Sequence, residues 1–286
     1  MEFSEHRIAT VDGPRIYLRD YAPQGTPKLP VVCLHGLTRN AADFEDVAPR
    51  IAAMGRRVLA LDARGRGKSD NDPDPTRYRS DVYCGDTIRA LDMLGVSRAV
   101  FLGTSMGGIM TMLLATMAPG RIASAILNDI GPEVDPKGIA RIASYVGKSG
   151  PFASWDAMTD AVKATQGALF PGRDDGFWRR FVQRVARERA DGMVEFAYDP
   201  KIATAFAQPQ AAPPPSMIPL FEALARVPVL VIRGADSDIL SRDGLATMQR
   251  IKPDLIAAEV PGMGHAPTLD EPEAVRAIEQ FLAQVE

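Results

Sequence analysis

A serine flanked by glycines is the feature that most constrains what this chain can fold into. The motif Gly103-x-Ser105-x-Gly107 follows an apolar run at residues 99–102 and precedes a stretch with helical spacing. In such a strand-to-helix turn the serine backbone is strained, and its neighbours approach other atoms too closely for side chains. The pattern predicts an exposed serine nucleophile, and the N–H of Met106 at the start of the helix can face a negatively charged oxygen.

Short apolar runs alternate with helical patterns along most of the chain. The runs that predict strands are residues 8–11, 15–21, 31–34, 58–61, 99–102, 125–127, 227–232 and 255–260. The first two flank Asp12-Gly13, a hairpin signal, and the others alternate with helices. This order predicts an α/β fold with a mostly parallel, eight-stranded sheet covered by helices on both faces.

The pattern changes between residues 131 and 226, where helical segments follow one another without a convincing strand. We expect residues 131–226 to form a helical cap, or lid, inserted into a core domain made of residues 1–130 and 227–286. Aromatic residues are frequent in this segment and include Trp155 and Trp178. They would form the core of the cap, and some could face a substrate.

Composition excludes several classes of protein. The chain has 286 residues and two cysteines. Because its net charge is −3, neither nucleic acid nor an acidic membrane is expected as a partner. No Cys/His spacing suggests a metal, and we expect no cofactor. No signal-peptide pattern and no apolar run of membrane-spanning length is visible, which favours a cytoplasmic protein with a small-molecule substrate. The sequence does not decide between a monomer and a homodimer.

A serine hydroxyl needs a general base, and histidine suits that task because its pKa lies near neutral pH. The chain has three histidines. His6 belongs to the first hairpin and His35 to the loop after the third strand, whereas His265 follows the last strand. Because sites in parallel sheets collect at the carboxyl ends of strands, His265 is the predicted base for Ser105.

A carboxylate should orient that histidine, and three candidates follow strands. Asp236 and Asp238 both follow the strand at residues 227–232, and Asp129 follows the strand after the serine. We favour Asp238 and keep Asp236 and Asp129 as alternatives. An acid that is not used would cap or stabilise a loop.

Four motifs together resemble those of the α/β-hydrolase fold superfamily. They are His35-Gly36, the D-x-R-G-x-G-x-S segment at residues 62–69, the serine turn at residues 103–108, and Gly264-His265. The resemblance implies an oxyanion hole made by the backbone N–H groups of Leu37 and Met106, and a cap at residues 131–226. It also favours Asp238, since many relatives carry R-G-x-x-S-D at the equivalent of residues 233–238.

The sequence therefore predicts a serine hydrolase that cleaves a small carboxylic ester or lactone through an acyl-enzyme on Ser105, without cofactor or metal. One rival is a carbon–carbon bond hydrolase acting on a diketone-like acid from aromatic degradation, which an arginine facing the pocket from the cap would favour. Another is a non-catalytic ligand-binding member of the fold. The arginine-rich run at residues 179–187 is interpreted as a solvated helix face above apolar residues, with anion binding as its alternative.

Overall fold

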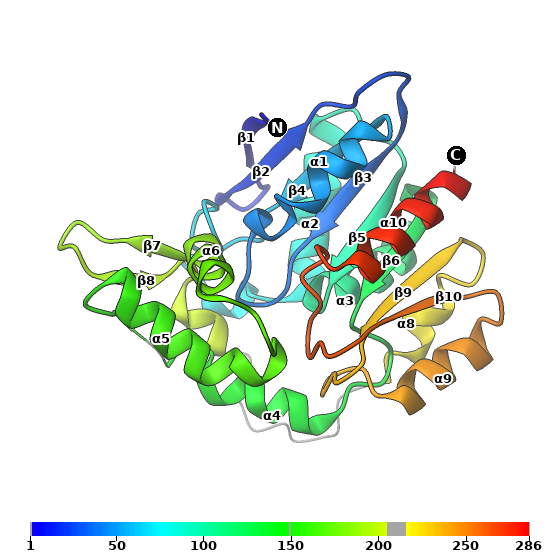
Figure 1. Cartoon of the computed structure of the whole chain (residues 1–286). Coiled ribbons are helices and arrows are strands. Elements are labelled where there is room, and N and C mark those ends of the chain that lie inside the picture. Colours follow the sequence, from blue (N-terminus) through cyan, green and yellow to red (C-terminus); the bar gives the residue numbers. More distant parts are fainter. Residues whose placement is uncertain (1, 149, 205–215, 286) are drawn as a thin grey trace.

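A single eight-stranded sheet forms the centre of the computed structural model, which describes residues 2–148, 150–204 and 216–285 (Figure 1). The strand order is β1-β2-β4-β3-β5-β6-β9-β10. The strands are β1 (Ser4–Ala9), β2 (Arg15–Tyr21), β3 (Lys28–Leu34), β4 (Arg56–Leu61), β5 (Ala99–Thr104), β6 (Ile122–Asn128), β9 (Val229–Gly234) and β10 (Ile256–Val260). Strand β2 runs antiparallel to β1 and β4, and the other neighbouring pairs are parallel. The predicted α/β class and mostly parallel sheet are confirmed.

Side chains of the central strands alternate between two apolar layers, because successive residues of a strand point to opposite faces. In β3, Val31 and Cys33 belong to the layer that contains α1 and α10, whereas Val32 and Leu34 belong to the layer of α2, α3, α8 and α9. These helices are α1 (Val47–Ala53), α2 (Ser80–Met93), α3 (Met106–Met117), α8 (Ile218–Glu222), α9 (Arg242–Ile251) and α10 (Pro272–Gln284). Burial on both faces explains why these strands read as continuous apolar runs.

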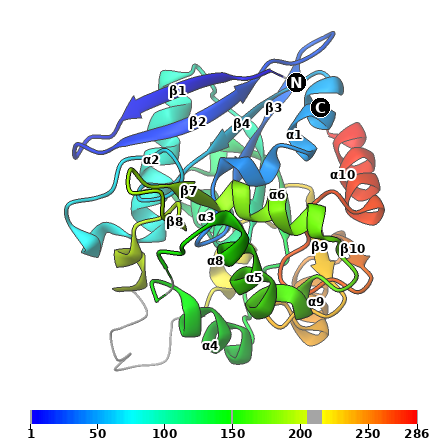
Figure 2. The ribbon, with the colours of Figure 1, turned by 60° about the vertical axis from the view of Figure 1, so that its left-hand side comes forward.

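The segment proposed as a cap forms a layer of its own beside the carboxyl ends of the strands (Figures 1 and 2). Its elements are α4 (Pro136–Tyr145), α5 (Trp155–Gln166), α6 (Asp175–Val185), β7 (Ala186–Glu188) and β8 (Val194–Phe196). The expectation of no strand here is wrong, since β7 and β8 pair as an antiparallel hairpin. These strands are three residues each, too short for a period-two pattern to stand out. Helix α8 lies in the same segment but packs in the apolar layer of α3.

Helix starts agree with the sequence in one case and differ in another. In the sequence, Asp135 and Asp270 stand shortly before Pro136 and Pro272 and are expected to cap the helices that follow. Asp135 accepts a hydrogen bond from the N–H of Lys137 and caps α4, as expected. Asp270 was expected to cap the last helix, but Glu271 occupies the N-cap position of α10, and Asp270 pairs with Arg173. Proline at the first helical position occurs in both helices, so the start signal was correct to within one residue.

Two further observations concern expectations from composition. Cys33 lies in an apolar run and Cys84 near a helix start, so the sequence predicts that both are buried and reduced. In the structure both are free and buried. Within residues 2–148, 150–204 and 216–285, no helix is long and apolar enough to cross a membrane.

Candidate active site

Ser105 sits between the end of β5 and the start of α3 with φ 51° and ψ −114°. These angles are strained for a residue with a side chain, as expected of a nucleophile turn. A Cβ atom at Gly107 would lie 1.9 Å from the carbonyl oxygen of Leu34, and one at Gly103 would lie 2.3 Å from that of Gly107. The turn predicted from the glycine spacing is therefore present, and only glycine fits beside the serine.

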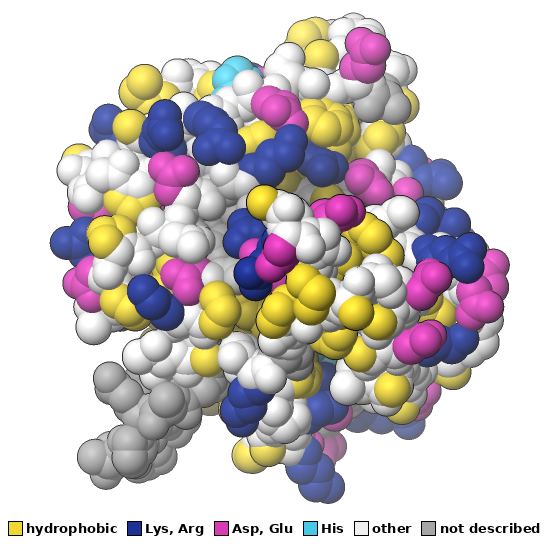
Figure 3. Space-filling view, turned by 90° about the vertical axis from the view of Figure 1, so that its left-hand side faces the viewer, with side chains coloured by type: hydrophobic (Ala, Val, Ile, Leu, Met, Phe, Trp, Pro, Cys, Tyr) yellow, Lys and Arg dark blue, Asp and Glu magenta, His cyan; other side chains and the backbone are white. Residues whose placement is uncertain are grey.

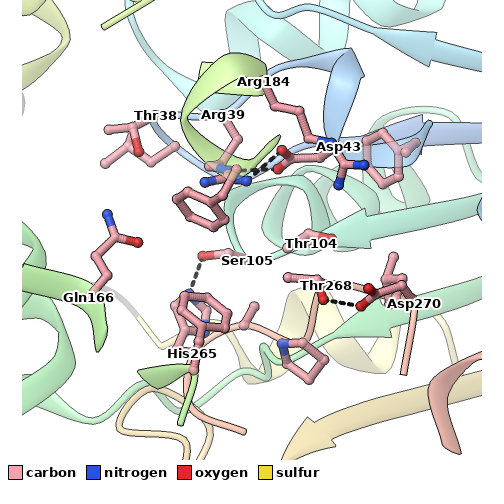
Figure 4. Close-up of a pocket in the computed structure, with 18 of the residues that line it drawn as sticks. Thr38, Arg39, Asp43, Thr104, Ser105, Gln166, Arg184, His265, Thr268 and Asp270 are labelled. Carbon is pink, nitrogen blue, oxygen red and sulfur yellow. Dashed lines mark hydrogen bonds and ion pairs between the residues drawn. The ribbon is translucent and has the colours of Figure 1, made fainter. Parts of the chain in front are cut away.

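His265 connects Ser105 to a buried carboxylate. Its Nε2 atom lies 2.8 Å from Ser105 Oγ, an interaction drawn in Figure 4, and its Nδ1 atom lies 2.8 Å from Asp129 Oδ2. The side chain of His265 is 8% exposed and that of Asp129 is 0% exposed. Because a carboxylate only accepts hydrogen bonds, Nδ1–H donates to Asp129, which leaves Nε2 to accept from the Ser105 hydroxyl.

The carboxylate on His265 is thus Asp129, and the expectation that Asp238 holds this position is wrong. Asp238 instead binds Arg141 of α4 through two hydrogen bonds, from Nε at 2.5 Å and from Nη2 at 2.8 Å. Burial raises the pKa of Asp238, but the hydrogen bond and the positive charge of Arg141, together with smaller contributions, lower it by more, so the pKa of this carboxyl lies below its usual value. Asp236 is exposed.

Strand order explains why Asp129 reaches the histidine. Strand β6 is the direct neighbour of β5, and Asp129 follows its last residue. The turn after β9 folds back onto this carboxylate, with Gly234 N–H donating to Oδ1 at 2.9 Å and Ser237 Oγ donating to Oδ2 at 2.7 Å. The next residue, Asp238, is thereby turned toward α4 rather than His265. The roles of Gly234 and Ser237 had no signal in the sequence, since they depend on the two strand ends lying side by side.

The loop after β3 lies directly against the serine. A Cβ atom on Gly36 would be 3.7 Å from Ser105 Cβ. His35 holds this loop, because its Nδ1 atom bonds the carbonyl oxygen of Gly36 at 2.7 Å while Nε2 accepts from Ala63 N–H at 2.9 Å. Since Gly36 C=O and Leu37 N–H belong to one peptide unit, that bond also orients the Leu37 N–H. Burial lowers the pKa of His35 to about 4, which keeps the ring neutral in this role.

A cavity of about 110 Å³ opens at Ser105 and His265. The sheet side contributes the loop after β3, and the proposed cap contributes α4, α5 and α6. Its lining includes Leu37, Thr38, Arg39, Asp43, Asp46, Ser105, Ile142, Tyr145, Gln166, Phe170, Phe177, Arg180, Phe181, Arg184, His265 and Asp270. In Figure 4 Ser105 and His265 lie between Gln166 and the Thr268–Asp270 pair. Of the residues expected to act together, Leu37, Ser105 and His265 therefore line one cavity, whereas Asp238 is not among its lining residues.

The arginine-rich helix α6 agrees with the sequence interpretation in part. Phe177, Phe181 and Val185 are buried beneath it, as predicted. Arg184 and Arg180, however, line the cavity, so this helix is not only a solvated face. Figure 3 shows that acidic and basic side chains are interspersed over the face of the molecule that carries the proposed cap. The charges at the site are therefore local features and not part of a large patch of one sign.

No metal site accompanies this arrangement in the part of the chain that the structure describes: no group of three or more His, Cys, Asp or Glu side chains there could hold an ion.

Comparison with known proteins identifies the family. Residues 30–272 match the family described as alpha/beta hydrolase fold, and the chain belongs to this family. A solved alpha/beta hydrolase from Novosphingobium aromaticivorans is 44% identical with a TM-score of 0.92, and the match covers 99% of both chains. At this level the chain is a hydrolase of the α/β fold, as the sequence predicted.

Two curated relatives match over nearly their whole length. A 3-hydroxybutyrate-oligomer hydrolase from Cupriavidus necator is 33% identical over 93% of this chain and 92% of the relative. A 2-(acetamidomethylene)succinate hydrolase from Mesorhizobium japonicum is 27% identical over 98% of this chain and 96% of the relative. Both are hydrolases, and their names point to different substrates.

Proposed function

We propose that the protein is a serine hydrolase that cleaves a small carboxylic ester through an acyl-enzyme on Ser105. The observation that carries this proposal is the connected series Ser105–His265–Asp129, with both hydrogen bonds at 2.8 Å, at the opening of a cavity. The similarity to a 3-hydroxybutyrate-oligomer hydrolase supports an ester of a hydroxy acid as the substrate, because such oligomers are joined by ester bonds.

In the proposed reaction, Ser105 Oγ attacks the carbonyl carbon while His265 Nε2 takes the hydroxyl proton. Asp129 holds the Nδ1–H tautomer and stabilises the imidazolium that forms. The backbone N–H groups of Leu37 and Met106 hold the oxyanion, as the resemblance implied. His265 then gives its proton to the departing alcohol. A water molecule, deprotonated by His265, next attacks the acyl carbon and releases the acid from Ser105.

We also propose that residues 131–226 act as a cap that shapes substrate choice. This segment supplies Ile142, Gln166 and the aromatic wall of Phe170, Phe177 and Phe181. Ring centroids in this wall are 5.5–5.8 Å apart, which packs the three phenyl groups as one apolar surface. This surface fits a short aliphatic or aromatic group next to the ester.

A carbon–carbon bond hydrolase is the second candidate, favoured by one observation. An arginine that faces the pocket from the cap is expected of such an enzyme, and Arg180 of α6 lines the cavity. Turnover of a vinylogous diketone acid, compared with turnover of esters, distinguishes the two. Preference for the diketone by 100-fold or more in kcat/KM would replace the ester assignment.

The test of the ester proposal is hydrolysis of p-nitrophenyl butyrate together with labelling by a fluorophosphonate probe. The native protein should do both, and Ser105→Ala should do neither. Ser97→Ala, at an exposed serine outside the cavity, is the matched control and should behave as the native protein. Labelling without turnover of any ester or diketone would instead support the ligand-binding alternative.

A further inference from the structure

Most charged groups at the cavity are neutralised by partners within the protein. Arg39 binds Asp43 through two hydrogen bonds of 2.7 Å, and Figure 4 shows this pair above Ser105. Arg184 contacts Asp46, with 2.6 Å between Nη2 and Oδ2. Arg184 also donates from Nε to Glu45 Oε1 at 2.7 Å. The forks of Arg39 and Arg184 are thus both occupied by carboxylates, so neither guanidinium is free to bind another one without losing a partner.

Arg180 differs from these residues. The remaining acid of the lining, Asp270, is paired with Arg173 at 3.1 Å, and Arg180 itself is exposed. Across residues 2–148, 150–204 and 216–285, Arg180 takes part in no ion pair and no side-chain hydrogen bond. It is therefore the one charged residue of the described lining that forms no ion pair within the described chain, although Asp174 Oδ1 and Arg180 Nη1 both lie within 3.5 Å of the place a Cβ on Gly176 would take.

The surroundings of Arg180 favour an anion from outside the protein. It lies on α6 between Phe177 and Phe181, which are buried and form part of the apolar wall. A ligand that fills the cavity displaces water from this wall, and the attraction between its charge and the guanidinium then grows. The planar guanidinium can give two parallel hydrogen bonds to a carboxylate.

We propose that Arg180 binds a carboxylate of the substrate, so that the protein prefers acidic esters to neutral ones of the same shape. This inference rests on the proposed function, because it concerns the substrate held at Ser105. Arg180 acts here in binding and specificity and takes no part in bond cleavage. The carboxylate can belong to the alcohol or to the acyl part of the ester, and both cases are tested.

The experiment compares each acid with its primary amide, which has nearly the same shape without the charge. One pair is the butyrate ester of 3-hydroxybutyrate and its amide, and the other is monoethyl glutarate and its amide. The quantity measured is the ratio of kcat/KM for the acid to that for the amide. Arg180→Gln should lower this ratio by about tenfold in at least one pair, a typical effect of one charged hydrogen-bonded contact.

Arg179→Gln is the matched control, because Arg179 is exposed on the same helix but does not line the cavity. It should leave the ratio unchanged. Added NaCl should reduce the ratio in the native protein and in Arg179→Gln but not in Arg180→Gln, since salt screens an exposed charge.

Two results would overturn the inference, and they can be told apart. If the native protein hydrolyses both members of each pair and Arg180→Gln leaves both ratios within twofold, carboxylate binding by Arg180 is refuted while the ester function stands. If the native protein hydrolyses no ester and is not labelled by the fluorophosphonate, the proposed function fails and the inference fails with it.

Discussion

Replacing Asp129 by asparagine tests the arrangement around His265 most directly. Asp129 accepts three hydrogen bonds: His265 and Ser237 donate to Oδ2, and Gly234 N–H donates to Oδ1. Asparagine has one acceptor oxygen and is tolerated at the φ of 57° found here. The substitution therefore changes the hydrogen bonding of a buried group and leaves the backbone conformation accessible.

The consequence is a change of tautomer. If the amide oxygen accepts from Gly234, the amide N–H₂ faces His265, which must then accept at Nδ1 and carry its proton on Nε2. If the amide is turned round, its N–H₂ meets the N–H of Gly234, and leaving that buried donor unpaired costs about 1–3 kcal/mol. The first orientation is favoured, and in it Nε2 can no longer accept the proton of Ser105.

We expect Asp129→Asn to lower kcat by about 10⁴-fold, or roughly 5 kcal/mol of transition-state stabilisation. Asp238→Asn is the matched control. It removes half of a partly exposed ion pair with Arg141, worth about 1 kcal/mol or less, and should lower kcat by less than about tenfold.

The assay is hydrolysis of p-nitrophenyl butyrate, with thermal unfolding to verify that each variant is folded. A larger loss of kcat in folded Asp238→Asn than in folded Asp129→Asn would refute Asp129 as the carboxylate that orients His265. An effect of less than tenfold for Asp129→Asn would equally contradict the tautomer argument.

Two other predictions concern stability. Burial lowers the pKa of His35 from 6.5 to about 4, so between these pH values the unfolded chain binds a proton at this ring and the folded protein does not. The contribution of His35 to the free energy of unfolding should therefore be fully present above pH 6.5 and fall by about 3 kcal/mol as the pH is lowered to 4. Urea unfolding between pH 7 and pH 4 should show this loss of free energy in the control His6→Gln but not in His35→Gln. An equal pH dependence of the free energy of unfolding in both variants would contradict the prediction. Gly107→Ala places a Cβ against the carbonyl oxygen of Leu34 and should lower the free energy of unfolding by about 2–4 kcal/mol. Gly120→Ala places its Cβ in open space and should lower it by less than about 1 kcal/mol. Similar urea midpoints for the two variants would contradict the close approach at Gly107.

Much of the fold was predictable because its signals are local. A short apolar run flanked by turn residues predicts a buried strand without knowledge of its neighbours. The nucleophile turn was equally local, since Gly103 and Gly107 leave room for the backbone beside Ser105. The hairpin of β7 and β8 was missed, because two three-residue strands carry too few residues for a periodic signal.

The sequence by itself determined the class of fold, the turn that presents Ser105, and the choice of His265 among three histidines. Only the tertiary structure decided which carboxylate meets that histidine. Asp129 and Asp238 both follow a strand. The sequence cannot show that Gly234 and Ser237, at the end of β9, donate hydrogen bonds to Asp129, or that Asp238 binds Arg141. It also cannot show that Arg180 alone lacks a partner among the described charges of the cavity. Such pairings depend on strand order and on distances between residues far apart in the chain, which local patterns do not encode.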